Sequence, residues 1–366
     1  MSIFLYAVLI FLVIRFSVTL FNFLSNPRLP KLFKHFSTKV SILIPARNEQ
    51  ENIIKLLLSI KNQDYEHYEV LILDDHSEDN TCAVVSKFCA ENPKFRIIRG
   101  KELPIGWLGK NFACHQLAAL ATGAFLFFLD ADEEIKPGLI NSMLTRMELG
   151  SLSLLSIFTN QQMLTLGEKL TVPLMHYILL SLLPLRLVKL SKNPMFAAAS
   201  GQCMFFEAKN YKDNCWHQEV KREVVEDIEI MKLVKQRGFK TEALLGNNLI
   251  YCRMYSGLKE AVDGFSKNLL AGFGKNIWIL LGYLTLVIVG PVLLFLNFNL
   301  AQLVLPLTII LLGRVMISLL SGQKIIENLV LHPIQMAFFL IIAIVSIKKY
   351  LFKSGAWKGR QLQTRL

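Results

Sequence analysis

Hydrophobic residues are concentrated at the two ends of the 366-residue chain and leave a polar middle region. Residues 3–24 form an apolar run that is interrupted by Arg15 and by a few hydroxyl or amide side chains. The run is long enough to span a bilayer, which needs about 20 residues. A cleaved signal peptide is disfavoured, because no basic residues precede the run and no small-x-small site follows it. We therefore expect a transmembrane anchor at residues 1–26.

The C-terminal region 277–352 contains further apolar stretches, which lie near 277–297, 299–320 and 329–347. The middle stretch contains Pro306 and Arg314 and is the weakest candidate to cross a membrane. Three crossings would put the C-terminus outside the cell, against the positive-inside rule. We expect two or three spans. Residues 257–276 are expected to form an interfacial helix. Residues 164–190 are expected to form helices that lie in the membrane interface, with an ordinary buried helix pair as the alternative.

The formal net charge is +12, and half of this excess lies in the last 19 residues. The tail at 353–366 is basic and follows an apolar span, which favours contact with anionic lipid headgroups. No basic stripe interleaved with aromatics occurs in the polar region, so we expect no nucleic-acid partner. Arg28, Lys31 and Lys34 follow the first span. By the positive-inside rule they predict a multi-pass protein of the cell membrane with a cytosolic middle domain.

The middle region, residues 38–256, alternates short β-branched runs with amphipathic segments. We expect strands at 40–44, 70–73, 95–98 and 124–129, and helices at 53–60 and 112–122. This alternation predicts an α/β domain whose mostly parallel sheet carries helices on both faces. Ligands bind beyond the carboxyl ends of the strands in such sheets. Polar clusters follow the predicted strand ends at 47–49, 74–75 and 130–132, so we expect the functional site there.

Asp130 and Asp132 follow directly after a predicted buried strand. Two carboxylates this close crowd negative charge, which is costly unless a cation pairs with it. Hard oxygen ligands suit Mg²⁺ or Mn²⁺, which usually bind one or two carboxylates together with substrate phosphates. The alternative is a helix that starts near residues 136–137, with Glu133 and Glu134 as acids at its N-terminus.

Three further positions have both a functional and a structural interpretation. Asp75 can accept hydrogen bonds from a nucleobase, whereas Ser77 or Asp79 caps the helix that follows. Lys110 ends a glycine-containing loop and can meet a pyrophosphate as a point charge, although the loop lacks the P-loop pattern. Glu226-Asp227 can supply a general base for an acceptor hydroxyl, or can be ordinary acids at a helix N-terminus. The six cysteines form no C-x-x-C pair and are expected to be reduced and mostly buried.

These strings occur in the order and spacing of the family 2 glycosyltransferases, which the chain resembles over about residues 38–256. The resemblance implies a GT-A nucleotide-diphospho-sugar transferase fold, flanked here by transmembrane helices, and an inverting, metal-assisted transfer from a UDP-sugar. It implies a nucleotide pocket lined by Pro45, Ala46, Arg47, Asn48 and Glu49, with Asp75 on the uracil and Lys110 near it or near the diphosphate. Asp130 and Asp132 would be the D-x-D pair, with Asp132 on the Mg²⁺ or Mn²⁺. Asp227 of the Glu226-Asp227 pair would be the catalytic base.

One departure from the family bears on the acceptor. Processive members carry Q-x-x-R-W, whereas this chain has Gly-Phe-Ser-Lys-Asn at 264–268 in the matching place. This argues against a polysaccharide synthase. The runs at 106–114, 264–268 and 357–360 resemble the lipid-glycosylating branch, which includes carotenoid-acid (diaponeurosporenoate-type) and hopanoid-associated glycosyltransferases. We expect transfer of a hexose, first glucose, to a membrane lipid or isoprenoid acceptor, first a carotenoid acid. The alternatives are a hopanoid or diacylglycerol acceptor, a polysaccharide synthase, and a catalytically dead membrane scaffold.

Overall fold

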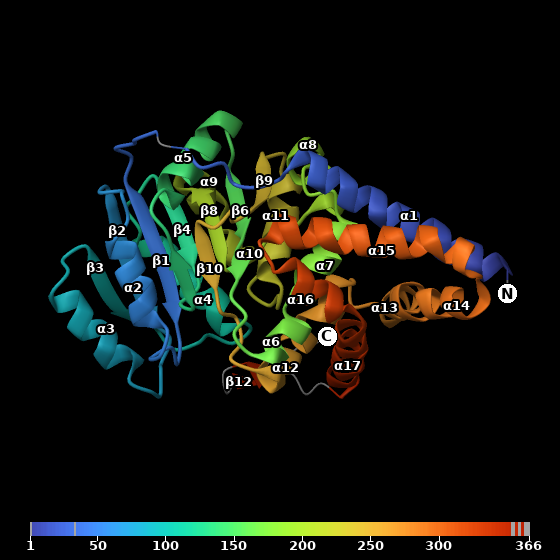
Figure 1. Ribbon diagram of the computed structural model, residues 1–366. Coiled ribbons are helices and arrows are strands. Elements are labelled where there is room, and N and C mark those ends of the chain that lie inside the picture. Colours follow the sequence, from blue (N-terminus) through green and yellow to red (C-terminus); the bar gives the residue numbers. More distant parts are fainter. Residues whose placement is uncertain (1, 33, 353–355, 358–359, 362–366) are drawn as a thin grey trace. The chain divides into compact units, whose positions relative to one another are not determined.

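The computed structural model describes residues 2–32, 34–352, 356–357 and 360–361 (Figure 1). The chain forms two compact units. We call Met1–Pro27, Met163–Leu185 and Met254–Gly355 the helical unit, and Arg28–Gln162, Arg186–Arg253 and Ala356–Leu366 the sheet unit. Most of the predicted basic tail, residues 353–366, lies outside the described residues.

The sheet unit is built on a seven-stranded sheet in the order β3-β2-β1-β4-β8-β6-β9. Its strands are β1 (Val40–Ala46), β2 (Tyr68–Asp74), β3 (Phe95–Arg99), β4 (Phe125–Leu129), β6 (Leu154–Phe158), β8 (Cys203–Glu207) and β9 (Thr241–Leu245). β3, β2, β1 and β4 run parallel, and so do β6 and β9. Only β8 is antiparallel to its neighbours β4 and β6. The predicted α/β fold with a mostly parallel sheet is confirmed.

The parallel strands bring the predicted polar clusters to one edge. Pro45 on β1 lies opposite Leu73 on β2, and Leu43 lies opposite Phe128 on β4. The carboxyl ends of these three strands therefore meet. Each of these strands has a buried, mainly apolar core because helices cover the sheet, and its few polar residues are Ser41, Glu69 and Asp74. The helices of this unit are α2 (Ile53–Lys61), α3 (Thr81–Ala90), α4 (Gly109–Leu120), α5 (Leu139–Gly150), α8 (Leu187–Leu190), α9 (Ala208–Asn214), α10 (Trp216–Glu219) and α11 (Glu226–Gln236), with a 3₁₀ turn at Pro194–Phe196.

A small second sheet corrects one interpretation of the acidic run after β4. It has the order β5-β10-β7, with β5 at Glu133–Ile135, β10 at Ile250–Cys252 and β7 at Asn160–Gln161. Glu133 and Glu134 were considered above as acids at a helix N-terminus, and that alternative is wrong. They pair with β10 as a strand, and α5 begins only at Leu139. Gly138 makes the turn with a positive φ of 90°, which favours glycine.

The helical unit contains the apolar ends of the chain. Its helices are α1 (Ser2–Ser25), α6 (Leu166–Thr171), α7 (Pro173–Leu182), α12 (Leu258–Gly272), α13 (Ile277–Leu284), α14 (Gly290–Asn297), α15 (Leu300–Ser321), α16 (Ile325–Val330) and α17 (His332–Leu351). A π-helical segment at Thr285–Val289 joins α13 and α14. Four helical stretches are long and apolar enough to cross a membrane: Ile3–Ser25, Ile277–Asn297, Leu300–Ser321 and His332–Leu351.

Two predicted interfacial segments also lie mainly in the helical unit. α7 packs against α1 and α15, and it buries Tyr177 and Ser181 among other residues. α12 packs against α6 and α17. The interfacial location of these segments stays a prediction. A short pair, β11 (Ala356–Trp357) and β12 (Arg360–Gln361), is described near the C-terminus.

Candidate active site

The loops that follow β1 and β2 are tied together by the Arg47 side chain. Its Nη1 donates to the backbone carbonyls of Asp75 at 2.7 Å and His76 at 2.8 Å. Its Nη2 pairs with the Glu78 carboxylate at 2.9 Å. The Asp75 N–H donates to the carbonyl of Ala46, the last residue of β1. Arg47 is buried, so it fixes the position of the loop that carries Asp75.

The same two loops contain strained backbone. Asn48 and His76 have positive φ values of 54° and 56°, which are uncommon for residues other than glycine. The Asn48 N–H donates to Ser77 Oγ at 3.0 Å, and Asn48 Oδ1 accepts from the Glu78 N–H at 2.8 Å. Such strain persists only where the surroundings enforce it, and it clusters at functional sites. The Asp79 carboxylate accepts from the N–H and the hydroxyl of Thr81. The N-cap position of α3 is held by Asn80, and not by Ser77 or Asp79 as predicted.

Lys110, near the start of α4, connects the two predicted acidic motifs. Its Nζ lies 2.8 Å from Asp130 Oδ1 and 3.3 Å from Glu226 Oε1. It also donates to the Gly201 carbonyl at 3.2 Å. Asp227 Oδ2 accepts from the Gly201 N–H at 2.7 Å, and Oδ1 accepts from the Ile228 N–H at 2.8 Å. The fold therefore brings Asp130, Lys110 and the Glu226-Asp227 pair into one cluster.

Burial and charge perturb the pKa values in this cluster. Burial raises the pKa of Glu226 to about 7, against the opposing charge of Lys110. Burial also raises the pKa of Asp227, although its hydrogen bond from the Ile228 N–H and the charge of Lys110 lower it. For Lys110, burial acts to lower the pKa, but Asp130 and Glu226 outweigh it and hold the value well above the usual range. Perturbed carboxyls of this kind are typical of catalytic acids and bases.

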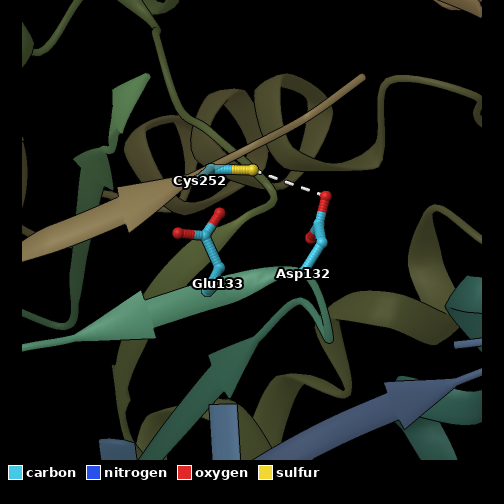
Figure 2. A group of neighbouring side chains, drawn as sticks. All are labelled: Asp132, Glu133 and Cys252. Atoms are coloured by element: carbon cyan, nitrogen blue, oxygen red, sulfur yellow. Dashed lines mark hydrogen bonds between the residues drawn. The ribbon is translucent and has the colours of Figure 1, made fainter. Parts of the chain in front are cut away.

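Asp132 lies in a second acidic cluster with Glu133 and Cys252 (Figure 2). The Cys252 thiol donates to Asp132 Oδ2 at 3.4 Å, and Gln202 Nε2 donates to the same sulfur at 3.0 Å. Burial, followed by the charges of Asp130 and Glu49, raises the pKa of Asp132 to about 7. Burial and the neighbouring Asp132 and Asp130 raise the pKa of Glu133 well above its usual range.

The residues of this cluster fit a divalent cation. Both carboxylate oxygens of Glu133 are buried and have no hydrogen-bond partner among the described residues. One ligand atom each from Asp132, Glu133 and Cys252 lies within 4.8 Å of the others. Carboxylate oxygens suit Mg²⁺ or Mn²⁺. Mg²⁺ and Mn²⁺ prefer oxygen ligands to the softer sulfur of a cysteine, so the carboxylates would hold the cation.

The structure brings most of the predicted site residues together. The two clusters described above contain Asp130, Asp132, Glu226, Asp227 and Lys110. The charge of Glu49 also acts on Asp132 and raises its pKa. Pro45 and Ala46 end β1 at the same sheet edge, next to the loops held by Arg47 and Asp75. The roles expected for these residues stay predictions.

Sequence reasoning missed three contributors: Gly201, Glu133 and Cys252. A Cβ atom at Gly201 would stand 3.0 Å from Glu226 Oε1 and 3.2 Å from Lys110 Nζ, so any larger residue would require these two side chains to shift by a few tenths of an ångström. Glu133 was considered only as a helix-terminal acid, and Cys252 only as a buried hydrophobe. Their shared cluster depends on the pairing of β5 with β10, which has no local signal in the sequence.

A mostly parallel sheet with a D-x-D pair directly after β4, and with an E-D pair at the start of α11 close to it, is the arrangement of a GT-A glycosyltransferase. Residues 41–212 match the sequence profile of Glycosyl transferase family 2, so the chain carries a domain of this family. The predicted family resemblance is confirmed.

Two relatives of known name are 4,4'-diaponeurosporenoate glycosyltransferases. The chain is 25% identical over 239 residues to that of Staphylococcus haemolyticus, covering 64% of this chain and 61% of the relative. It is 24% identical over 342 residues to that of Staphylococcus aureus, covering 88% of each chain. The chain thus spans about three fifths of the first relative and most of the second.

A solved structure supports the fold. The mannosyltransferase PcManGT of Pyrobaculum calidifontis, determined with GDP-Man and Mn²⁺, matches with a TM-score of 0.57 at 16% identity. The match covers 96% of this chain and 100% of that one. At this level of identity the likeness establishes a shared GT-A fold.

Proposed function

We propose that the protein is a membrane-bound, inverting glycosyltransferase that moves a hexose, first glucose, from a UDP-sugar to a lipid acceptor. A carotenoid acid of the diaponeurosporenoate type is the first acceptor to test. The observation that carries this proposal is the alignment with the S. aureus enzyme, which covers 88% of both chains. It therefore extends beyond the shared domain at 41–212 into the apolar regions.

The proposed location is the cell membrane, with several crossings and the sheet unit on the cytosolic side. Four sufficiently long apolar helices support membrane attachment. The basic residues Arg28 and Lys31, which directly follow α1, support the orientation. A membrane-attached enzyme can take a nucleotide sugar from water and an acceptor from the bilayer.

In the proposed donor site, Asp75 accepts hydrogen bonds from the uracil, and Pro45, Ala46 and Glu49 line the pocket. Arg47 supports this role by holding the Asp75 carbonyl at 2.7 Å, so the loop is positioned before the donor arrives. Lys110 is proposed to lie near the diphosphate while it balances the charge of Asp130.

Asp132, with Asp130 beside it, is proposed to hold Mg²⁺ or Mn²⁺. When bound, the cation neutralises charge that develops on the leaving diphosphate. The proposal is supported by the buried and unpartnered oxygens of the neighbouring Glu133. It is also supported by the Mn²⁺ in the mannosyltransferase of the same fold.

Asp227 is proposed as the base for a hydroxyl acceptor. One of its carboxylate oxygens takes the hydroxyl proton while the acceptor oxygen bonds to the anomeric carbon and the bond to the diphosphate breaks. The backbone N–H groups of Gly201 and Ile228 hold both oxygens in place. Its raised pKa brings the base nearer to neutral pH, where proton transfer is most effective.

A carboxylate acceptor changes the role of Asp227. Such an acceptor is already ionised at neutral pH, so Asp227 has no proton to remove from it. The elevated pKa of Asp227 therefore favours a second candidate, in which the acceptor is a lipid alcohol such as diacylglycerol or a hopanoid. Arg253, in the sheet unit, is proposed to steer an acidic headgroup if the acceptor is a carotenoid acid.

The test supplies the full-length protein with labelled UDP-glucose and Mn²⁺ in detergent. Acceptors are a C30 carotenoid acid, the matching carotenoid alcohol and diacylglycerol. We expect labelled product on the carotenoid acid. Label that appears only on diacylglycerol identifies the second candidate. Label only in a long water-soluble chain identifies a polysaccharide synthase. No release of UDP under any condition identifies a dead scaffold.

The variant Asp227→Asn separates the two acceptor chemistries. With an alcohol acceptor, we expect turnover to fall by a factor on the order of 10² to 10⁴ while donor binding stays near normal. With a carboxylate acceptor, the loss should be much smaller. Asp213→Asn, a change of the same type at an exposed position, is the control. Equal losses of donor binding and turnover would assign Asp227 a structural role.

A further inference from the structure

Two buried arginines face the same aromatic ring inside the helical unit. Arg15 lies on α1 and is 6% exposed, and Arg314 lies on α15 and is 1% exposed. Their guanidinium carbons lie 4.6 Å and 5.0 Å from the centre of the Tyr177 ring on α7. Two positive charges are thus held close together on helices that are apolar enough to cross a membrane.

Neutral groups hold both guanidinium groups in place. Arg15 donates to Ser181 Oγ at 2.7 Å and to the Tyr177 hydroxyl at 3.1 Å. Arg314 donates through Nη2 to the side-chain oxygens of Asn328 and Gln335. Among the described residues, neither arginine forms an ion pair with a carboxylate. The protein positions these charges but, within the described part of the chain, does not neutralise them.

Several polar atoms around this ring also lack partners. Nε and Nη1 of Arg314, the hydroxyl of Tyr283 and Nδ1 of His332 are buried and make no hydrogen bond within the described residues. The His332 ring lies 5.5 Å from that of Tyr177, and Arg15 lies 5.7 Å from the Tyr283 ring. All four atoms can donate a hydrogen bond, given the appropriate histidine tautomer.

Such an arrangement is costly without an anion. A buried charge is tolerated when a counter-charge and hydrogen bonds satisfy it, and two like charges that share a site repel each other. Ionisable groups inside membrane segments are rare and usually mark functional sites. The missing component is a group with negative charge and several acceptor oxygens, which describes a phosphate or a carboxylate.

The surroundings indicate that this anion belongs to a lipid. Val13 and Ile14 on α1, and Leu311 and Leu312 on α15, are next to or near the arginines in sequence and expose large apolar side chains. The outer surface of the unit at this level is therefore suited to hydrocarbon and not to water. Arg15 lies ten residues before the end of α1, and Arg314 lies seven before the end of α15. These separations place both about 10–15 Å from the helix ends.

We propose that Arg15 and Arg314 form a binding site for the anionic headgroup of a membrane lipid, with Tyr177 between them and Tyr283 and His332 as further donors. The ligand is a lipid that carries a phosphate or carboxylate. The site is distinct from the acidic clusters of the sheet unit, and it does not depend on the proposed transfer reaction.

The test measures lipid retention by the full-length protein with native mass spectrometry. The wild type is purified in detergent, stripped of lipid and then exposed to phosphatidylglycerol, oleic acid or phosphatidylcholine. We expect one anionic lipid to stay bound at concentrations where the zwitterionic lipid does not. Equal retention of phosphatidylcholine, or no retained lipid in the wild type, would overturn the proposal whatever the variants do.

Variants then locate the site. Arg15→Gln and Arg314→Gln should each weaken retention roughly 10- to 100-fold, the loss expected for charge-assisted hydrogen bonds. Lys87→Gln removes one charge from an exposed position on α3 of the sheet unit and should leave retention unchanged. If Arg314→Gln does not fold, Arg314→Lys keeps the charge but loses the forked donor group, and should weaken retention less. Retention that drops equally in Lys87→Gln would indicate a general charge effect and refute the site.

A last arm distinguishes lipid from free anion. Inorganic phosphate at millimolar concentration should not displace phosphatidylglycerol, because the lipid also gains from its apolar chains. Displacement at that concentration would show that the site takes free phosphate and would overturn the lipid assignment. Comparison of phosphatidylglycerol with oleic acid decides between a phosphate and a carboxylate headgroup.

Discussion

Lys110 should set the pH range in which the enzyme works, because it is the cation that faces both acidic motifs. Its Nζ lies 2.8 Å from Asp130 and 3.3 Å from Glu226. At an effective dielectric constant of about 20, these separations correspond to gross attractions of about 6 and 5 kcal/mol. The lysine side chain is 23% exposed and loses solvation, so the net value is smaller. We take about 1.4–2.7 kcal/mol as the net stabilisation that Lys110 gives to the ionised carboxylates of Glu226 and Asp227. This corresponds to a pKa shift of about 1–2 units.

The variant Lys110→Met removes this charge and keeps a side chain of similar size. The positive charge of Lys110 lowers the pKa values of Glu226 and Asp227, so both carboxyls should bind protons at higher pH without it. A base is inactive when protonated. The acidic limb of the pH profile of kcat/KM should therefore move upward by about 1–2 pH units. At pH values well below the wild-type limb, activity should fall by roughly 10- to 100-fold, and it should recover at alkaline pH.

The assay measures UDP release from UDP-glucose in saturating Mn²⁺, with an alcohol acceptor, over a wide pH range. Lys110→Arg keeps the charge and should leave the limb where it is. Lys101→Met removes an exposed lysine of the same unit and controls for net charge. A Lys110→Met profile that is uniformly lower but not displaced would refute this reasoning. It would instead indicate that Lys110 contacts the donor diphosphate.

Two further predictions concern the metal site and the stability of the sheet unit. Asp132→Ala should abolish transfer and weaken UDP-sugar binding in Mn²⁺ without unfolding the domain, and full wild-type activity in EDTA would disprove the metal role. Glu242→Gln should destabilise the unit by about 3 kcal/mol, because the buried Glu242 carboxylate pairs with Arg146 at 2.6 Å. Its melting temperature should drop by roughly 6–12 °C. Glu148→Gln at the exposed Lys34 pair should cost less than about 1 kcal/mol; similar drops in both variants would contradict this reading.

Local pattern was sufficient to predict the first four strands of the sheet unit. The predicted strands at 40–44, 70–73, 95–98 and 124–129 lie within or within one residue of β1 to β4. Three of them are short β-branched or aromatic runs that are almost entirely buried, and the remaining one, β3, is an edge strand with an exposed Arg96. This pattern needs no knowledge of distant contacts. The apolar stretches at the two ends were visible for the same reason. Helix limits were less accurate: the stretch expected at 329–347 is α17 at His332–Leu351, since Pro333 favours the first turn of a helix.

The sequence also identified Asp75 and the Asp130–Asp132 pair, because each follows directly after a predicted strand; Glu226-Asp227 starts α11 and was assigned from the family resemblance. In a parallel sheet, strand ends converge, so Asp75 and Asp130 could be assigned to one edge before their contacts were known. Short segments of sequence were sufficient for this assignment because the direction and order of the strands are largely set by short, right-handed connections.

Only the tertiary structure decided which groups touch. Lys110 and Gly201 are 91 residues apart, and Cys252 and Asp132 are 120 residues apart, yet each pair is in contact. These contacts require β10 to pair with β5, and require the antiparallel β8 to pass beside β4. Strand pairing of this kind joins segments that are far apart in the sequence and depends on the packing of the whole unit, so no local periodicity encodes it. The same holds for Arg15 and Arg314, whose shared position on the Tyr177 ring depends on how three helices pack.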